Sequence, residues 1–168
     1  MILDAAKQAI GILPNARNSD VWHLWKLLEA HKEGDVVLFS SILSIAECTH
    51  ADGNMDDRVQ NLFKRLLLSG EHLKLVQPTP YIAADARDLR WKYNINLGGA
   101  DGLHVSSAVD RKCSEFLTVD DRILKESSKI GQLGPNVVQP SKTNLLPNKY
   151  RQGNLLDDKV AKFKRSSP

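Results

Sequence analysis

The stretch that decides the fold is Gly98-Gly99-Ala100-Asp101-Gly102-Leu103-His104-Val105-Ser106-Ser107-Ala108, followed shortly by Glu115-Phe116-Leu117-Thr118-Val119-Asp120. It predicts a glycine turn, a helix that opens on a carboxylate, and a short apolar strand that ends on a second carboxylate. In an α/β fold, helix starts and the carboxyl ends of strands face a shared crevice. Asp101 and Asp120 are therefore expected to meet there, with a cation between them.

The segments around this stretch alternate between short apolar runs and helices with an apolar stripe. Val36-Val37-Leu38-Phe39 is a continuous apolar run, which is typical of a strand buried on both faces of a parallel sheet. Other strands are predicted at 73–76, 116–119 and 137–138, and helices at 20–31, 42–49, 56–69, 81–91, 101–112 and 122–129. This alternation predicts an α/β protein, a three-layer α/β/α sandwich with a central, mostly parallel sheet of short strands.

Length and composition predict one domain and a tail. The chain has 168 residues, of which 42% are hydrophobic and 26% charged, as in an ordinary globular protein. After Pro140 apolar residues become sparse and basic residues frequent. We therefore expect a domain over residues 1–140 and a basic, weakly structured C-terminal tail over residues 141–168 that adds little to the core.

Cysteine content and hydropathy bear on the compartment. Two cysteines, Cys48 and Cys113, are too few for a disulfide framework, so a reducing compartment is expected. No apolar run approaches the roughly 18 residues of a membrane span, and no charged segment precedes an apolar core at the N-terminus. A cytoplasmic protein without a membrane association is the expectation. The net charge of +3 permits a polyanionic partner but does not require one.

Glu47 is an ionisable residue in a predicted helix whose neighbouring positions are apolar. A buried carboxylate without a partner costs several kcal/mol, roughly, so it needs a cation, an arginine or a proton. Two interpretations stay open. Glu47 either lies at the margin of the buried face, in water or paired with Arg87 or Arg90, or it shares a metal ion with other acids.

The two aspartates also have simpler interpretations. Asp101 follows a Gly-Gly turn, so it could be a helix cap or a first-turn residue, worth about 1 kcal/mol. Asp120 could belong to a strand-to-helix loop in which Asp121 caps the next helix. Gathered in one crevice with Glu47, however, the acids would repel one another until Mg²⁺ or Mn²⁺ bound. A metal-bound water could then attack a phosphodiester, so the arrangement predicts phosphodiester hydrolysis.

Taken together, three segments resemble the PIN domain, a small magnesium-dependent nuclease fold whose members include the toxin ribonucleases of bacterial and archaeal VapBC toxin–antitoxin pairs. The segments are Ser41-Ile42-Leu43-Ser44-Ile45-Ala46-Glu47, Ala100 to Ala108, and Phe116-Leu117-Thr118-Val119-Asp120. The resemblance runs from about Asp4 to Pro140, and its specificity lies in the order and spacing of the segments.

The resemblance implies a set of acidic metal ligands that act in catalysis. On this chain they fall on Glu47, Asp101 and Asp120, with Asp4 as the candidate for the aspartate that ends the family's first strand. Met1 to Leu3 could be that strand, although Asp4 could equally open a helix. The family usually has a serine or threonine directly after this aspartate, where the chain has Ala5-Ala6-Lys7.

Two functions are therefore predicted from the resemblance. The first is an endoribonuclease that hydrolyses RNA through carboxylate-bound Mg²⁺ or Mn²⁺, as a toxin of a toxin–antitoxin pair. The alternative is a degenerate PIN-fold module that binds RNA or a protein partner without cleaving RNA, because its first acidic motif is altered.

Further residues are expected to serve the substrate and partners. A basic rim must offset the repulsion of phosphates from an acidic crevice, and Arg87, Arg90 and Arg122 are candidates. Thr118 could hydrogen-bond the site or the substrate. His104, three residues after Asp101, is expected to be a bystander rather than a base or a ligand.

Protein partners also follow from the resemblance. It implies an antitoxin peptide that lies along the groove and folds on binding. It also implies a homodimer formed through helices such as 20–31, where Trp22 and Trp25 would offer apolar area.

Overall fold

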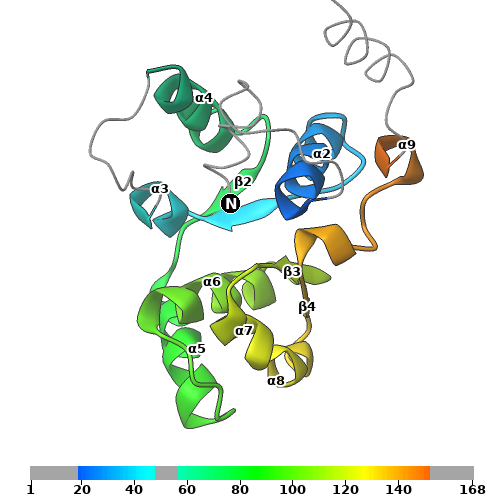
Figure 1. Ribbon diagram of the computed structural model, residues 1–168. Coiled ribbons are helices and arrows are strands. Elements are labelled where there is room, and N and C mark those ends of the chain that lie inside the picture. Colours follow the sequence, from blue (N-terminus) through cyan, green and yellow to red (C-terminus); the bar gives the residue numbers. More distant parts are fainter. Residues whose placement is uncertain (1–18, 48–56, 152–168) are drawn as a thin grey trace, which may run out of the picture.

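The computed structural model describes residues 19–47 and 57–151, and Figure 1 shows short strands near the centre with helices around them. The strand predicted at Met1–Leu3 and the candidate ligand Asp4 lie outside these residues, as does Cys48. The elements run in the order α2 (Asp20–Lys32), β1 (Phe39–Ser41), α3 (Leu43–Glu47), α4 (Asp57–Leu68), β2 (Lys74–Val76), α5 (Pro80–Trp91), α6 (Gly99–Asp110), β3 (Glu115–Leu117), α7 (Asp121–Lys125), α8 (Ser127–Gly131), β4 (Asn136–Val138), a 3-10 turn η1 (Pro140–Lys142) and α9 (Asn148–Arg151).

The strands pair in two parallel ladders. In the described part of the chain, β1 pairs with β2 with Phe39 opposite Lys74, and β3 pairs with β4 with Glu115 opposite Asn136. Helices α3 and α4 lie between the first two strands in the chain, and α7 and α8 between the last two, as parallel pairing requires. The predicted α/β class with short parallel strands and flanking helices is confirmed.

One strand lies three residues later than the apolar run predicted. β1 begins at Phe39 rather than Val36, and the Val37 side chain is 56% exposed instead of buried on both faces. The backbone N–H groups of Asp35 and Val36 both donate to the carbonyl of Ala30, at 2.9 and 3.4 Å. These amides close the C-terminal end of α2, so this part of the run does not serve as a strand.

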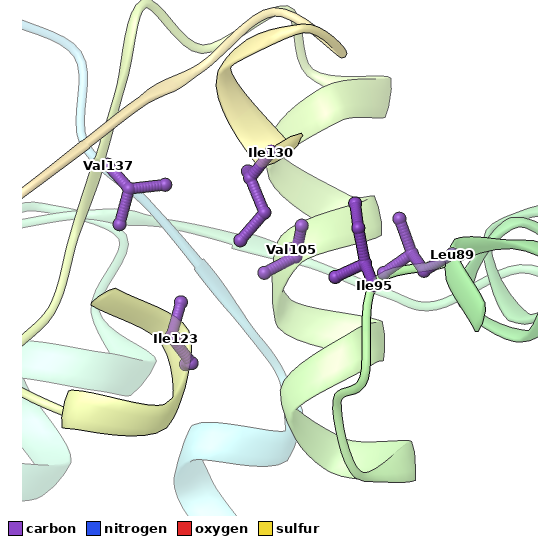
Figure 2. Close-up of a cluster of buried hydrophobic side chains, with 6 residues drawn as sticks. All are labelled: Leu89, Ile95, Val105, Ile123, Ile130 and Val137. Carbon is purple, nitrogen blue, oxygen red and sulfur yellow. The ribbon is translucent and has the colours of Figure 1, made fainter. Parts of the chain in front are cut away.

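Two apolar clusters flank the strands. The first joins α2 and α4 through Leu24, Leu28, Leu66, Leu67 and Leu73. The second, shown in Figure 2, gathers Leu89, Ile95, Val105, Ile123, Ile130 and Val137. Its members come from α5, α6, α7, α8, β4 and the turn after α5, so this core fixes the starts of α6 and α7, where Asp101 and Asp120 lie. Trp22, which was expected to offer dimer surface, is instead only 6% exposed.

The residues that follow Pro140 belong to the core. Thr143 and Leu146 are each 2% exposed, and Leu146 packs against Leu27 and Ala30 of α2. The prediction that the segment after Pro140 adds little to the core is therefore wrong for residues 141–151. A count of apolar residues does not detect this burial, which involves one leucine and one threonine.

Polar contacts fasten the same segment to the body of the domain. The backbone N–H of Ser141 donates to Oδ1 of Asp20 at 2.8 Å, and the Thr143 hydroxyl donates to Glu115. Farther along, the Tyr150 hydroxyl donates to the Asp35 carboxylate. In residues 19–47 and 57–151, no helix combines the length and apolarity that crossing a membrane requires.

Candidate metal centre

Asp101 lies in the first turn of α6, close to the packing surface between α5 and α6. Gly98 is the N-cap residue of this helix, and the side chain of Asp101 is 20% exposed. Gly102 lies against α5, where a Cβ atom would come within 3.4 Å of the carbonyl oxygen of Ala86. The start of α6 is therefore in direct contact with α5.

Asp120 stands at the other side of the site, where β3 gives way to α7. Its Oδ1 accepts a hydrogen bond from the backbone N–H of Arg122 at 2.8 Å, so Asp120 is the N-cap that we expected Asp121 to be. The buried Thr118 hydroxyl accepts from the backbone N–H of Asp120 at 3.0 Å. Thr118 therefore orients the loop that carries Asp120.

Arg122 joins the two aspartates. Its Nη2 lies 2.7 Å from Oδ2 of Asp120 and 3.5 Å from Oδ2 of Asp101. The hydrogen bonds from Arg122 hold the pKa of Asp120 well below its usual range, at about 2. The predicted meeting of Asp101 with Asp120 is thus present in the structure, with a guanidinium as the cation between them.

Glu47 is the last residue of α3 and is exposed rather than buried among the apolar positions. Its partner is neither Arg87 nor Arg90. Oε2 of Glu47 lies 2.6 Å from Nε2 of His104 on α6, and the two side chains are 46% and 19% exposed. His104 was expected to be a bystander, and the structure makes it instead the contact that ties Glu47 to the helix of Asp101.

A single cavity of about 750 Å³ connects these residues. Glu47, Asp101, His104, Thr118 and Asp120 all line it, along with residues of β1 and β3. Within the described ranges, no three acidic, histidine or cysteine side chains converge closely enough to form a complete metal site. The fourth candidate ligand, Asp4, lies outside those ranges. The other three candidates, Glu47, Asp101 and Asp120, all line the cavity.

The arrangement nevertheless fits a divalent cation in one respect. One guanidinium nitrogen lies within 3.5 Å of carboxylate oxygens from two different elements. A positive group already stands between Asp101 and Asp120. Both aspartates would offer hard carboxylate oxygens, which Mg²⁺ and Mn²⁺ prefer.

The other predicted substrate-binding arginines lie on α5. Arg87 is bound to Asp88 and its guanidinium carbon lies 4.7 Å from the centroid of the Trp91 ring. Arg90 is exposed on the same helix. Among the ion pairs of the described residues, neither arginine joins Glu47, Asp101 or Asp120, so only Arg122 of the three stands at the acids.

Comparison with known protein families identifies the family of this chain. A family model for the PIN domain matches residues 16–128. The match spans more than half of the sequence, and the chain belongs to the PIN-domain family. PIN domains are generally nucleases, and they typically use divalent metals such as Mg²⁺ or Mn²⁺. Neither the curated proteins nor the solved structures yielded a match to this chain.

Two features of the site were not predicted from the sequence. The contact between His104 and Glu47 joins residues 57 positions apart, and helical spacing relates His104 only to its own helix. Arg122 was predicted to bind substrate, but its two ion pairs place it between two candidate metal ligands. Arg122 follows Asp120 by two residues at the start of α7, and this spacing was the signal in the sequence for their ion pair.

Proposed function

We propose that this protein is a divalent-metal endoribonuclease, in which Mg²⁺ or Mn²⁺ is held by Asp101 and Asp120 with Glu47 and Asp4 as the remaining acidic ligands. The observation that supports it most directly is the position of Arg122, whose side chain is 70% exposed and bound to both aspartates. Two carboxylates with one cation leave a negative charge, which favours binding of a further cation.

The bound metal would supply a hydroxide at neutral pH and would offset charge on the leaving oxygen. The chain's own residues prepare the site for it. Thr118 orients the loop of Asp120, and His104 holds the carboxylate of Glu47 toward α6. Arg122 is 70% exposed, and because an exposed ion pair contributes little to stability, its guanidinium could leave the aspartates and contact a substrate phosphate if a metal were bound there.

A second candidate function is the binding of RNA or a protein without cleavage. The observation that favours it is the same guanidinium, which already occupies the space between Asp101 and Asp120, together with the absence of three converging donors among the described residues. A role as the toxin of a toxin–antitoxin pair belongs to the nuclease proposal, and an antitoxin peptide as partner and a homodimer remain predictions drawn from the family.

Cleavage of single-stranded RNA with and without Mn²⁺ separates the two functions, together with calorimetric titration of the metal. We expect cleavage that requires metal and that falls by at least about 100-fold in Asp101→Asn. The matched control is Asp110→Asn at the other end of α6, where an exposed acid pairs with Arg111 at 3.0 Å. Full activity in Asp101→Asn would exclude the nuclease centre proposed here.

A further inference from the structure

The end of α5 carries an exposed aromatic surface that the proposed metal centre does not use. The side chain of Trp91 is 72% exposed and that of Tyr93, two residues later, is 50% exposed. Among the nine aromatic residues in the described ranges, only Tyr81 at the start of the same helix is more exposed than these two. Two solvent-exposed aromatic residues so near in the chain are typical of a contact surface.

A cation lies over the tryptophan ring. The guanidinium carbon of Arg87 is 4.7 Å from the ring centroid of Trp91. Asp88 holds the guanidinium in place, because Nε and Nη2 of Arg87 both donate to its Oδ1, at 3.1 and 2.9 Å. With most of the ring still exposed, the stack of guanidinium and indole presents an ordered flat surface to solvent.

The turn after the tryptophan is fixed as well. Ile95 is fully buried, and its backbone N–H donates to the carbonyl of Leu89 at 2.9 Å. Asn94 adopts a left-handed backbone with a φ of 52°, and its carbonyl accepts from Nζ of Lys129 at 2.7 Å. The backbone on the C-terminal side of Tyr93 is thus held by two hydrogen bonds.

The charges around this surface favour an anion. Arg87, Arg90 and Lys92 lie within six residues of one another, and Nζ of Lys92 is 2.6 Å from Oδ2 of Asp88. Asp88 faces two of these cations and Asp85 precedes them, so positive charge exceeds negative charge. Trp and Tyr rings also serve protein contacts, but an excess of cations around exposed rings matches a chain of phosphates with unstacked bases.

We propose that Arg87, Trp91 and Tyr93 form a stacking platform for unpaired bases of a single-stranded nucleic acid. The platform deepens the nuclease function proposed above and rests on it. Helix α5 packs along α6, whose first turn carries Asp101, so the platform and the metal centre belong to one pair of helices (Figure 1). Bases that stack at the end of α5 retain a strand whose backbone is cut elsewhere.

The test measures binding of a short fluorescein-labelled single-stranded RNA in EDTA, where no metal-dependent cleavage occurs. Trp91→Leu keeps an apolar side chain but removes stacking, and it is expected to weaken binding by about 10-fold. Trp91→Tyr should retain most of the affinity. Tyr81→Leu is the matched control, an exposed aromatic residue on the same helix that should leave binding unchanged. Because Trp91 is exposed, these variants should fold, and circular dichroism verifies it.

The outcomes separate the platform from the nuclease. Wild-type affinity in Trp91→Leu overturns the platform even when metal-dependent cleavage is intact. Weakened binding in Trp91→Leu supports the platform even when no cleavage is found, which would instead overturn the nuclease. A wild-type protein that binds no RNA overturns the platform, as does a Trp91→Leu variant in which only self-association changes in sedimentation.

Discussion

Two regions of this molecule combine acidic and basic side chains in opposite proportions. On α5, one carboxylate lies between two cations, because Asp88 accepts from Arg87 at 2.9 Å and from Lys92 at 2.6 Å. At the start of α6 and α7, two carboxylates share one cation, because Asp101 and Asp120 both reach Arg122. The first region has an excess positive charge and the second an excess negative charge.

The difference teaches which ligand each region can take. A region with an unbalanced cation attracts phosphates, and a region with an unbalanced carboxylate attracts a metal ion. Both regions lie on the contacting helices α5 and α6 or on the start of α7. The following changes break or sharpen this contrast.

The largest effect is expected where the excess negative charge is removed. The double variant Asp101→Asn with Asp120→Asn leaves Arg122 without a carboxylate, and affinity for Mn²⁺ should fall by at least about 100-fold. Isothermal titration calorimetry measures it. Asp88→Asn, which changes the other region, should leave Mn²⁺ affinity unchanged. Equal losses in both variants would show that the two regions do not differ as proposed.

A smaller loss is expected when Glu47 loses its partner. His104→Leu removes the hydrogen bond to Oε2 of Glu47, and affinity for Mn²⁺ should fall by about 10- to 100-fold, as for other residues that orient a metal ligand. His104→Gln, which can still donate, should recover part of the loss. Titration calorimetry of both variants tests the prediction, and identical affinities in wild type and His104→Leu would contradict it.

A gain of affinity is expected when the shared cation is removed. Arg122→Gln takes away the group that competes with a metal for the two aspartates, so Mn²⁺ should bind about 5-fold more tightly. Arg87→Gln is the matched control, an arginine with an ion pair on the other region. The prediction fails when Arg122→Gln binds the metal more weakly than wild type.

The smallest expected effect is on the stability of the fold at low pH. The pKa of Asp120 is lowered to about 2 in the folded chain by hydrogen bonds from Arg122, and it is about 3.9 when unfolded. The unfolded chain therefore binds more protons between these values, and stability contributed by the pair falls as the pH drops from about 4 to 2. Melting temperatures in this window should fall less steeply in Arg122→Gln, where NMR titration should find the Asp120 pKa back in its usual range.

Much of the fold follows from the sequence. Apolar stripes and glycine turns located the helices over 20–32, 80–91 and 99–110 to within two residues. The strand at β1 was displaced because amides at Asp35 and Val36 close the preceding helix, a tertiary choice that an apolar run does not record. The stretch after Pro140 looks like a tail in the sequence, because its burial depends on Leu146, Thr143 and hydrogen bonds to distant residues rather than on an apolar run.

The positions of the acidic residues were predictable from the sequence, but their side-chain partners were not. The sequence placed Asp101 at a helix start and Asp120 at a strand end, and the topology brings them to one arginine. The choice of that arginine, and of His104 for Glu47, depends on side-chain reach across elements. Residue spacing along one helix does not predict contacts between different elements.

The residues after Pro140 also set the order of events during synthesis. Leu146 seals the face of α2, and Tyr150 bonds to the loop that follows that helix. Protein is made from the N-terminus, so Leu27 and Ala30 of α2 meet Leu146 only after a segment more than a hundred positions downstream has been made. A ribosome paused short of that segment would hold a nascent domain with an open apolar surface, which is the form that chaperones recognise.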